Sequence, residues 1–320
     1  FNITYQFTFA PRYSWAQDRN WSSSESVFDT THGSATRASS RSIVWTLDNI
    51  IKWNYTFAQK HLVDVTLLQS AEQSQYWSES MTGKQFSPTD ILEWHNMQSA
   101  NEKTFSSNDE KYTGDALMAR LFYSYDNRYM LTASVRRDGF SAFGRSNPRA
   151  TFPSLALAWN FSNESFFNWD PMSNGKLRIS WGKNGNRDIG IYQALSQLTT
   201  GSGISKYSYA TSAGTLYELS TLQIERMANN DLKWESTASW NVGLDFGFLN
   251  NRINGSLEWY YMPTTDLLMD RTLPNISGYS SVVTNLGKVV NSGFEISLHS
   301  VNIDNENFSW NTAFNLSHNK

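Results

Sequence analysis

The sequence predicts an all-β protein: an antiparallel up-and-down transmembrane β-barrel, of which the chain supplies about eleven strands. Three observations lead to this fold. Apolar and polar residues alternate with a period of two along the whole chain. The connections between these segments are alternately short and long along the chain. The composition is aromatic yet low in charge, with 13 Trp, 15 Tyr and 19 Phe among 320 residues and 17% charged residues.

The first segment, Phe1 to Phe9, shows the alternation most clearly, because its odd positions are apolar and its even positions polar. This is the pattern of a strand with one apolar and one wet face. The longest uninterrupted apolar run, 155–159, is far shorter than the about 20 residues of a spanning helix. The further strands are expected, in chain order, around residues 45–57, 63–67, 117–125, 131–135, 155–159, 177–181, 240–248, 253–261, 294–298 and 308–316.

The connections fall into two kinds. Turn-like links are expected at 58–60, 126–128, 249–252 and 302–307, with a somewhat longer one at 161–175. Long polar segments are expected to form loops at 10–41, 70–114, 138–150, 183–234 and 262–288. In an up-and-down sheet this places all short turns at one edge and all long loops at the other, as in outer-membrane barrels with short periplasmic turns and long extracellular loops. Strands of about 9–11 residues would match a tilted membrane crossing.

The polar face of these strands carries charges that a dry core would have to pair, whereas a wet lumen solvates them. We therefore expect a water-facing set of Arg120, Arg136, Arg178, Asp245, Glu258, Glu295 and His299. Rings near strand ends are typical of the membrane–water interface. Here they are Trp159, Trp181, Trp259 and Tyr261.

Several kinds of site are not supported by the residues. The chain has no Cys, so it has no disulfide framework or thiol nucleophile, and its net charge of −3 gives no nucleic-acid footprint. The five His are scattered, and no Gly-rich block opens a helix. We therefore predict no catalytic, metal or cofactor-binding residue and no enzyme. A soluble carbohydrate-binding β-protein and an outer-membrane enzyme barrel stay open as alternatives.

Three blocks carry a family resemblance. Residues 131–144 read LTASVRRDGFSAFG and are followed by FPSLALAW (152–159) and KLRISWGKNGN (176–186). The second block reads NDLKWEST (230–237), and the third NLGKVVNSGFE (285–295). In order and spacing they resemble the C-terminal half of the barrel in SusC/RagA-like TonB-linked (TonB-dependent) outer-membrane transporters of Bacteroidota-type bacteria. Two departures occur, RDGFSAFG for the usual RDGSSRFG and NNDL for NPDL.

The resemblance implies that residues 1–320 are a partial transmembrane barrel domain, with the plug domain absent, from a barrel of about 22 strands. It implies a multi-pass protein of the bacterial cell outer membrane that imports oligosaccharides or oligopeptides. The implied partners are a SusD-like surface lipoprotein, TonB acting through the plug, and outer-membrane lipid, with no nucleic acid and no cofactor. A siderophore- or cobalamin-type TonB-dependent receptor is the alternative within this class.

Aromatic rings on the expected extracellular loops are candidate contacts for substrate or for the lid protein, because rings stack on sugars and peptides at a small entropy cost. Packing between loops is the alternative reading of the same rings. The pair Tyr76–Trp77 and the segment 206–209 are the preferred candidates. The full set is Trp15, Trp21, Tyr76, Trp77, Trp94, Tyr207, Tyr209 and Tyr279.

Overall fold

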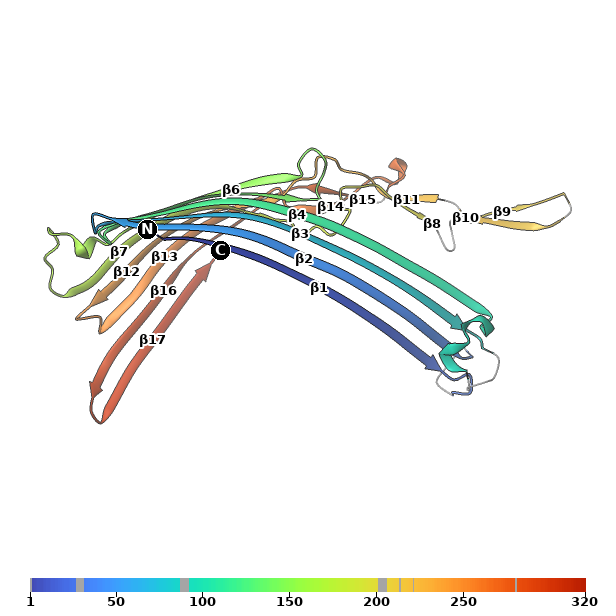
Figure 1. The fold of residues 1–320 in the computed structure, drawn as a ribbon, viewed down its shortest axis with the longest axis horizontal. Helices are drawn as coiled ribbons and strands as arrows, with labels where there is room; N and C mark the ends of the chain where they lie inside the picture. The colour runs from blue at the N-terminus through green and yellow to red at the C-terminus, as the bar shows by residue number, and fades with distance from the viewer. Residues whose placement is uncertain are drawn as a thin grey trace. The chain divides into compact units, whose positions relative to one another are not determined.

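The structure, a computed structural model, describes residues 2–26, 32–86, 92–200, 206–212, 214–220, 222–279 and 281–320. Eleven strands form one sheet in which chain neighbours are also sheet neighbours (Figure 1), so the predicted all-β, up-and-down architecture is confirmed. The strands are β1 (Asn2–Ser22), β2 (Ser34–Phe57), β3 (His61–Lys84), β4 (Glu102–Tyr125), β5 (Tyr129–Phe140), β6 (Arg149–Trp159), β7 (Met172–Asn186), β12 (Glu235–Phe248), β13 (Ile253–Thr265), β16 (Lys288–Asn305) and β17 (Phe308–Asn319).

Smaller elements lie in the long connections. Three two-stranded ribbons pair β8 (Gln197–Thr200) with β11 (Leu222–Arg226), β9 (Lys206–Ala210) with β10 (Leu216–Ser220), and β14 (Leu268–Thr272) with β15 (Ser281–Asn285). Single 3₁₀ turns are η1 (Glu93–His95), η2 (Met97–Ser99), η3 (Phe161–Asn163) and η4 (Asn275–Ser277). None of the helices in the described ranges is long and apolar enough to cross a membrane.

Short and long connections alternate as predicted. The tight turns after β2, β4, β12 and β16 gather at the left in Figure 1, together with the longer link between β6 and β7. Ala58 and Gln59 both have positive φ, as do Asp126 and Asn127. Two consecutive residues with positive φ are the geometry that joins antiparallel strands without splaying them.

The expected bounds of the loops 10–41 and 70–114 are wrong. Most of each segment is strand, and β1 to β4 are 21 to 24 residues long rather than about 9–11. The reason is that a strand is held by its backbone ladder, which persists where both faces are polar, whereas apolar alternation detects only a strand with one dry face. The loops 138–150, 183–234 and 262–288 shrink for the same reason, and the last two contain the ribbons.

By its internal contacts the chain divides into two compact units. Unit 1 comprises residues 1–6, 50–69 and 116–320, and unit 2 comprises 7–49 and 70–115. Strands β1 to β4 contribute residues to both. Each unit is described by itself below.

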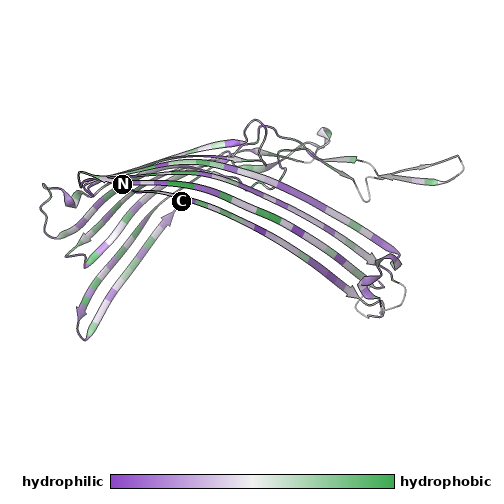
Figure 2. Ribbon diagram, in the orientation of Figure 1, coloured by the Kyte–Doolittle hydropathy of each residue, from purple (hydrophilic) through white to green (hydrophobic). Residues whose placement is uncertain are grey.

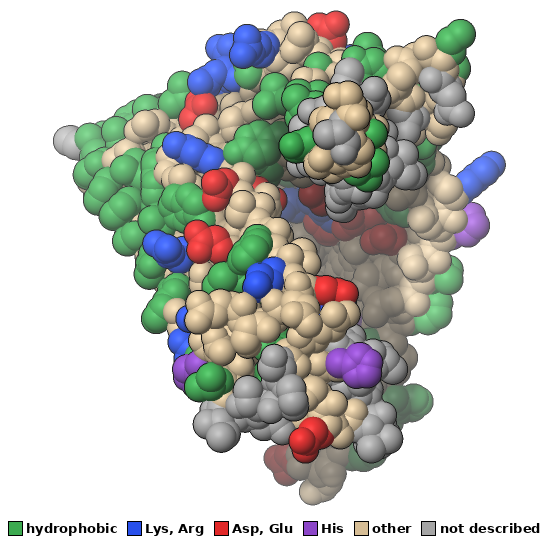
Figure 3. Space-filling view, turned by 90° about the vertical axis from the view of Figure 1, so that its right-hand side faces the viewer, with side chains coloured by type: hydrophobic (Ala, Val, Ile, Leu, Met, Phe, Trp, Pro, Cys, Tyr) green, Lys and Arg blue, Asp and Glu red, His purple; other side chains and the backbone are tan. Residues whose placement is uncertain are grey.

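One face of unit 1 is an apolar surface built from cross-strand rows. The register aligns Leu157, Ile179, Val242, Trp259 and Phe294 across five neighbouring strands. Four of these side chains stay exposed, for example 51% for Leu157 and 49% for Trp259, and Val242 is half-buried. Bands of opposite hydropathy alternate along the strands in Figure 2, and hydrophobic side chains gather on one flank of the surface in Figure 3. So large an apolar face suits contact with hydrocarbon rather than water.

Candidate functional site

The opposite face of unit 1 carries an ion-pair network at its centre. Arg178 on β7 donates from Nε and Nη2 to the two Asp245 carboxylate oxygens on β12, at 2.8 and 2.7 Å. The same Nη2 donates to Oε1 of Glu258 on β13 at 2.8 Å. These three charges were predicted to share the polar face, and the structure brings them together. Both acids are about a quarter exposed, as expected for a wet wall rather than a dry core.

Gly243 explains how one arginine reaches across two strands. It lies on β12, between Arg178 and Glu258 in the register. A Cβ at this position would meet Nη2 and Cζ of Arg178 at 3.0 and 3.1 Å. The guanidinium therefore lies flat over a strand that has no side chain at that point.

Tyr260 on β13 also lies over a glycine of the neighbouring strand. It stands opposite Gly293 of β16, and a Cβ on Gly293 would lie 2.6 Å from the tyrosine oxygen. The Tyr260 hydroxyl donates to Asn319 on β17 at 3.1 Å. The side chains of Arg178 and Tyr260 thus lie along this face, over a glycine in each case, instead of standing out from it.

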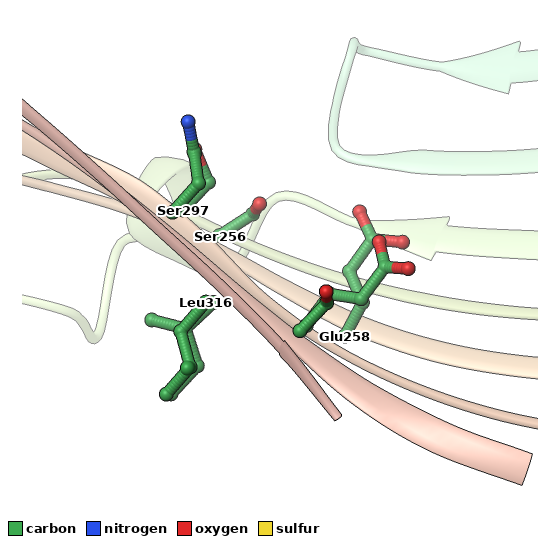
Figure 4. A pocket seen from close by; sticks show the side chains of 8 residues that line it. Ser256, Glu258, Ser297 and Leu316 are labelled. Carbon is green, nitrogen blue, oxygen red and sulfur yellow. The ribbon is translucent and has the colours of Figure 1, made fainter. Parts of the chain in front are cut away.

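A shallow groove of about 350 Å³ follows this face along β13, β16 and β17. Figure 4 shows Ser256, Glu258 and Ser297 on one side of the sheet and Leu316 on the other. Glu258 stands directly opposite Glu295, so the groove presents carboxylate, hydroxyl and amide groups. These groups can hydrogen-bond a polar solute. In the described part of the chain no three His, Asp or Glu side chains gather in a way that could hold a metal ion.

The remaining charges predicted for this face are more scattered. Arg136 pairs with Asp138 on its own strand at 2.8 Å. Arg120 lines a separate groove of unit 1 together with Asp64. His299 stands opposite Asn254 in the register.

A buried cluster joins the long connections of unit 1. Phe143, Ala194, Leu232 and Trp234 are at most 7% exposed, and Leu232 is completely buried. The Phe143 and Trp234 rings stack at 4.8 Å. The cluster unites the β5–β6 connection with the β7–β12 connection, and Leu268 and Val283 of the β14–β15 ribbon pack against it.

We call the cluster of Phe143, Ala194, Leu232 and Trp234 the loop anchor. Hydrogen bonds to backbone atoms hold the connections together around it. The Gly144 amide donates to the Leu232 carbonyl at 3.1 Å. The Asn285 side chain accepts from the Lys233 amide at 2.9 Å and donates to the Lys233 carbonyl at 2.7 Å. A Cβ on Gly144 would lie 2.1 Å from the Asn230 carbonyl oxygen. The sequence blocks 131–144, 230–237 and 285–295 therefore meet here, a role that the spacing of the blocks did not reveal.

A second polar cluster lies at the short turns. Glu164, in the β6–β7 connection, is 8% exposed. It accepts from the Trp159 indole at 3.0 Å and from Arg128 at 3.1 Å. Hydrogen bonds from Tyr129 and then Trp159, together with the charge of Arg128, lower the pKa of Glu164 below its ordinary value. Arg128 also pairs with Asp126, so this cluster ties two turns together.

The ring candidates lie mostly in strands rather than in loops. Trp15 and Trp21 belong to β1, and Tyr76 and Trp77 to β3. Trp77 directly follows Tyr76 in the chain, so the two rings point to opposite faces of the strand. Trp94 lies in η1 and Tyr279 in the β14–β15 ribbon connection, half-buried.

Two of the candidates are packed against other residues. Trp21 meets Phe86 edge-on at 5.2 Å, and both belong to the cluster around Ala35 and Ala100 in unit 2. Trp94 packs against the same cluster. Tyr207 and Tyr209 lie in β9, where Tyr209 stands opposite Tyr217; the positions of their rings are outside the described part.

The sequence matches known proteins over its whole length. The family model described as "TonB dependent receptor-like, beta-barrel" matches residues 1–319. TonB-dependent receptor P26 of Formosa agariphila is 31% identical over 324 residues, which cover 98% of this chain and 31% of the relative. TonB-dependent receptor SusC of Bacteroides thetaiotaomicron is 38% identical over 202 residues, or 62% of this chain and 20% of the relative.

The fold also matches solved structures. The structure titled "Structure of the RagAB peptide transporter" superposes with a TM-score of 0.84 at 22% identity, covering 99% of this chain and 34% of that one. The "open-open" RagAB peptide importer gives 0.82 at 24% identity, with the same coverage of 99% and 34%. At these identities the likeness concerns the fold. The chain spans between 20% and 31% of the length of the curated relatives it matches.

Proposed function

Because the chain belongs to the TonB-dependent receptor-like β-barrel family, an outer-membrane family, we propose that it forms part of the wall of an importer for large nutrients. The observation that supports this proposal most directly is the sheet of unit 1, which has one apolar and one polar face. Its exposed apolar rows face lipid, and its opposite face is wet, with Arg178, Asp245 and Glu258 at its centre. A wall of this kind separates a polar passage from a membrane.

The proposed cargo is an oligosaccharide or an oligopeptide. The relatives named SusC and RagAB peptide transporter support an importer of this type. The side chains of Arg178 and Tyr260 also support it, since they lie flat over Gly243 and Gly293 and do not extend toward a bulky solute. The groove beside Glu258 offers hydrogen-bonding groups but no fixed pocket for one small ligand.

The proposed partners are a SusD-like surface lipoprotein as the lid and TonB as the energy source. The likeness to SusC and to the fold of RagAB supports this assignment. The loop anchor around Leu232 would serve it mechanically, because it holds three long connections in one fixed group at the rim where a lid would sit. We propose no covalent chemistry for this protein.

The test is growth and uptake by a strain that lacks the whole gene. We expect loss of growth on one class of defined glycans or peptides, recovered by the intact gene and absent in a strain without TonB. The lidding lipoprotein should co-purify with the tagged full-length protein. Loss of growth on iron chelates or cobalamin alone would instead indicate a siderophore- or cobalamin-type receptor. Partition of the protein into the aqueous phase without detergent would refute the membrane wall.

A further inference from the structure

The ladder between β6 and β7 stops before either strand does. Its last pair, on the side of the long connections, is Ser154 with Gly182. Beyond this pair β6 continues to Arg149, paired with β5, and β7 continues to Asn186, paired with β12. Pro153, next to Ser154, has no N–H to donate and so interrupts a ladder. Within these described strands the wall therefore has a seam, a stretch where no ladder joins β6 to β7.

Two connections join the sides of this seam by hydrogen bonds of their own. Residues 144–147 of the β5–β6 connection donate three hydrogen bonds to backbone carbonyls of residues 230–232 in the β7–β12 connection, at 3.0 to 3.1 Å. Two come from the backbone amides of Gly144 and Ser146, and one comes from the Asn147 side chain. We call these three hydrogen bonds the loop bridge. It joins the same two sides as the missing part of the ladder, because the first connection leads into β6 and the second leaves β7.

Aromatic rings fill the seam beside the loop bridge. A Cβ on Gly185 of β7 would meet the Phe152 ring of β6 and, at 3.0 Å, the Trp234 ring of the loop anchor. The Phe152 and Trp234 rings meet edge-on at 5.6 Å. A glycine at this point of β7 is what gives the two rings their room. Packed rings and the loop bridge thus close the seam in place of strand pairing.

Two polar atoms beside these rings are buried without a hydrogen-bond partner in the described part of the chain. They are Nε1 of Trp234 and Oγ of Ser236, and both residues are 7% exposed. Ser236 stands directly opposite Gly185 in the register, so its side chain is on the side of the sheet where the two rings lie. A buried polar group without a partner raises the free energy of the closed arrangement, and water would satisfy both groups once the rings part.

We propose that the loop bridge is a reversible joint, closed in this structure, that opens to let the β5–β6 connection part from the β7–β12 connection. Opening costs little, because it breaks no strand ladder and brings water to two unpaired polar atoms. The six pairs of the β6–β7 ladder stay intact below it. The use of the joint rests on the proposed import function: the open joint widens the rim for a large nutrient, and the closed joint holds the connections together beneath the lid.

The first experiment measures opening without any cargo. The chain has no Cys, so a single cysteine reports its own position once any cysteine elsewhere in the full-length receptor is replaced by serine. Ala194→Cys puts the thiol inside the loop anchor, where Ala194 is 2% exposed. In intact cells a membrane-impermeant maleimide should label it about tenfold faster than Ala35→Cys, the matched control, since opening that is easier by about one hydrogen bond gives about this factor. Ala35 is as deeply buried, at 1%, but belongs to the cluster of unit 2. Equal labelling rates would overturn the proposal.

Ser236→Ala tests the part played by the unpaired hydroxyl. It removes the buried Oγ and leaves the Cβ in place, so the closed joint should become more stable and labelling of Ala194→Cys at least about fivefold slower. Ser239→Ala is the control, because Ser239 lies on the same strand but on the opposite face, and it should leave the rate unchanged. A rate that Ser236→Ala does not change overturns the physical reason given for opening.

A disulfide across the joint tests its use in transport. Residues that face each other across backbone hydrogen bonds have Cα atoms about 5.5 Å apart, within the reach of a disulfide. The oxidised Ser146→Cys/Asn230→Cys receptor should therefore import the glycan or peptide on which wild-type cells grow at least about tenfold more slowly, and a reductant should restore the rate. Ser146→Cys alone is the control. Wild-type uptake by the fully oxidised receptor overturns the proposal. If the wild type imports neither class of nutrient, the import proposal fails, while the labelling rates still decide whether the joint opens.

Discussion

Replacement of Gly243 by valine tests whether the wet face depends on a strand position without a side chain. Arg178 reaches Glu258 only by lying over Gly243, where a Cβ would already approach its Nη2 at 3.0 Å. The methyl groups of valine extend beyond Cβ into the same space. We expect the hydrogen bond to Glu258 to be lost, while Asp245, on the strand adjacent to Arg178, keeps part of its pairing.

The magnitude follows from the geometry. A hydrogen bond between charged groups contributes about 1.5–3 kcal/mol. The side chains of Arg178 and Glu258 are 32% and 28% exposed, so solvent screening reduces this to about 1 kcal/mol. Valine also favours a strand over glycine by up to about 1 kcal/mol. The single substitution can therefore change the free energy of unfolding very little, and only the coupling between the two positions is informative.

A double-mutant cycle measures this coupling. Gly243→Val, Glu258→Gln and the double variant are unfolded in guanidinium chloride from detergent, with Trp fluorescence as the readout. Glu258→Gln should cost about 1 kcal/mol in the wild-type background and close to nothing in the Gly243→Val background. Gly182→Val is the matched control, because a Cβ there meets only Ser154, with 3.2 Å to its Cβ and 3.9 Å to its Cα, and not Arg178. It should leave the cost of Glu258→Gln unchanged. An equal cost of Glu258→Gln in the Gly243→Val and wild-type backgrounds would refute the reasoning.

Three further predictions concern the two clusters. Glu164→Gln should flatten the acid dependence of thermal stability: the lowered pKa means that the carboxylate stabilises the fold above its ordinary value of 4.5, and that this contribution is lost as the pH falls through the lower native value. A wild-type and variant melting midpoint that fall in parallel between about pH 5 and 3 would contradict this. Leu232→Ala should cost about 2–5 kcal/mol locally and speed hydrogen exchange at the Gly144 amide, with Leu286→Ala, an exposed position, as the control. Gly144→Ala should increase proteolysis of the long connections, because its Cβ would overlap the Asn230 carbonyl oxygen; unchanged cleavage would show that the loop anchor tolerates the shift.

Most of the main sheet could be predicted from the sequence, but little of the outer strand ends and the long connections could. Alternation located the eleven strands of the main sheet and the order of short and long connections, because a strand between lipid and water must repeat every two residues. It also grouped Arg178, Asp245 and Glu258 on one face. It ended β1 and β3 too early, since polar residues such as Gln17 and Arg19 interrupt the apolar alternation in their outer parts.

The candidate rings show the same limit. In the sequence, Trp21 and Trp94 cannot be told apart from loop rings that contact a ligand. In the structure both pack against the cluster of Ala35 and Phe86. Contacts between residues so far apart in the chain leave no periodic trace. For Tyr76 and Trp77, by contrast, strand alternation alone separates the two faces once β3 is known to continue through them.

By itself the sequence determined the class of protein, its two-faced strands and its family resemblance, because these depend on local periodicity and on short blocks. Only the tertiary structure decided what the blocks do. It brought residues 131–144, 230–237 and 285–295 together around Leu232, and it placed Arg178 over a glycine so that it reaches two strands away. It also joined the β5–β6 and β7–β12 connections at the point where the β6–β7 ladder ends. Each of these depends on register between distant strands and loops, which is fixed by pairing across the sheet and not by any single segment.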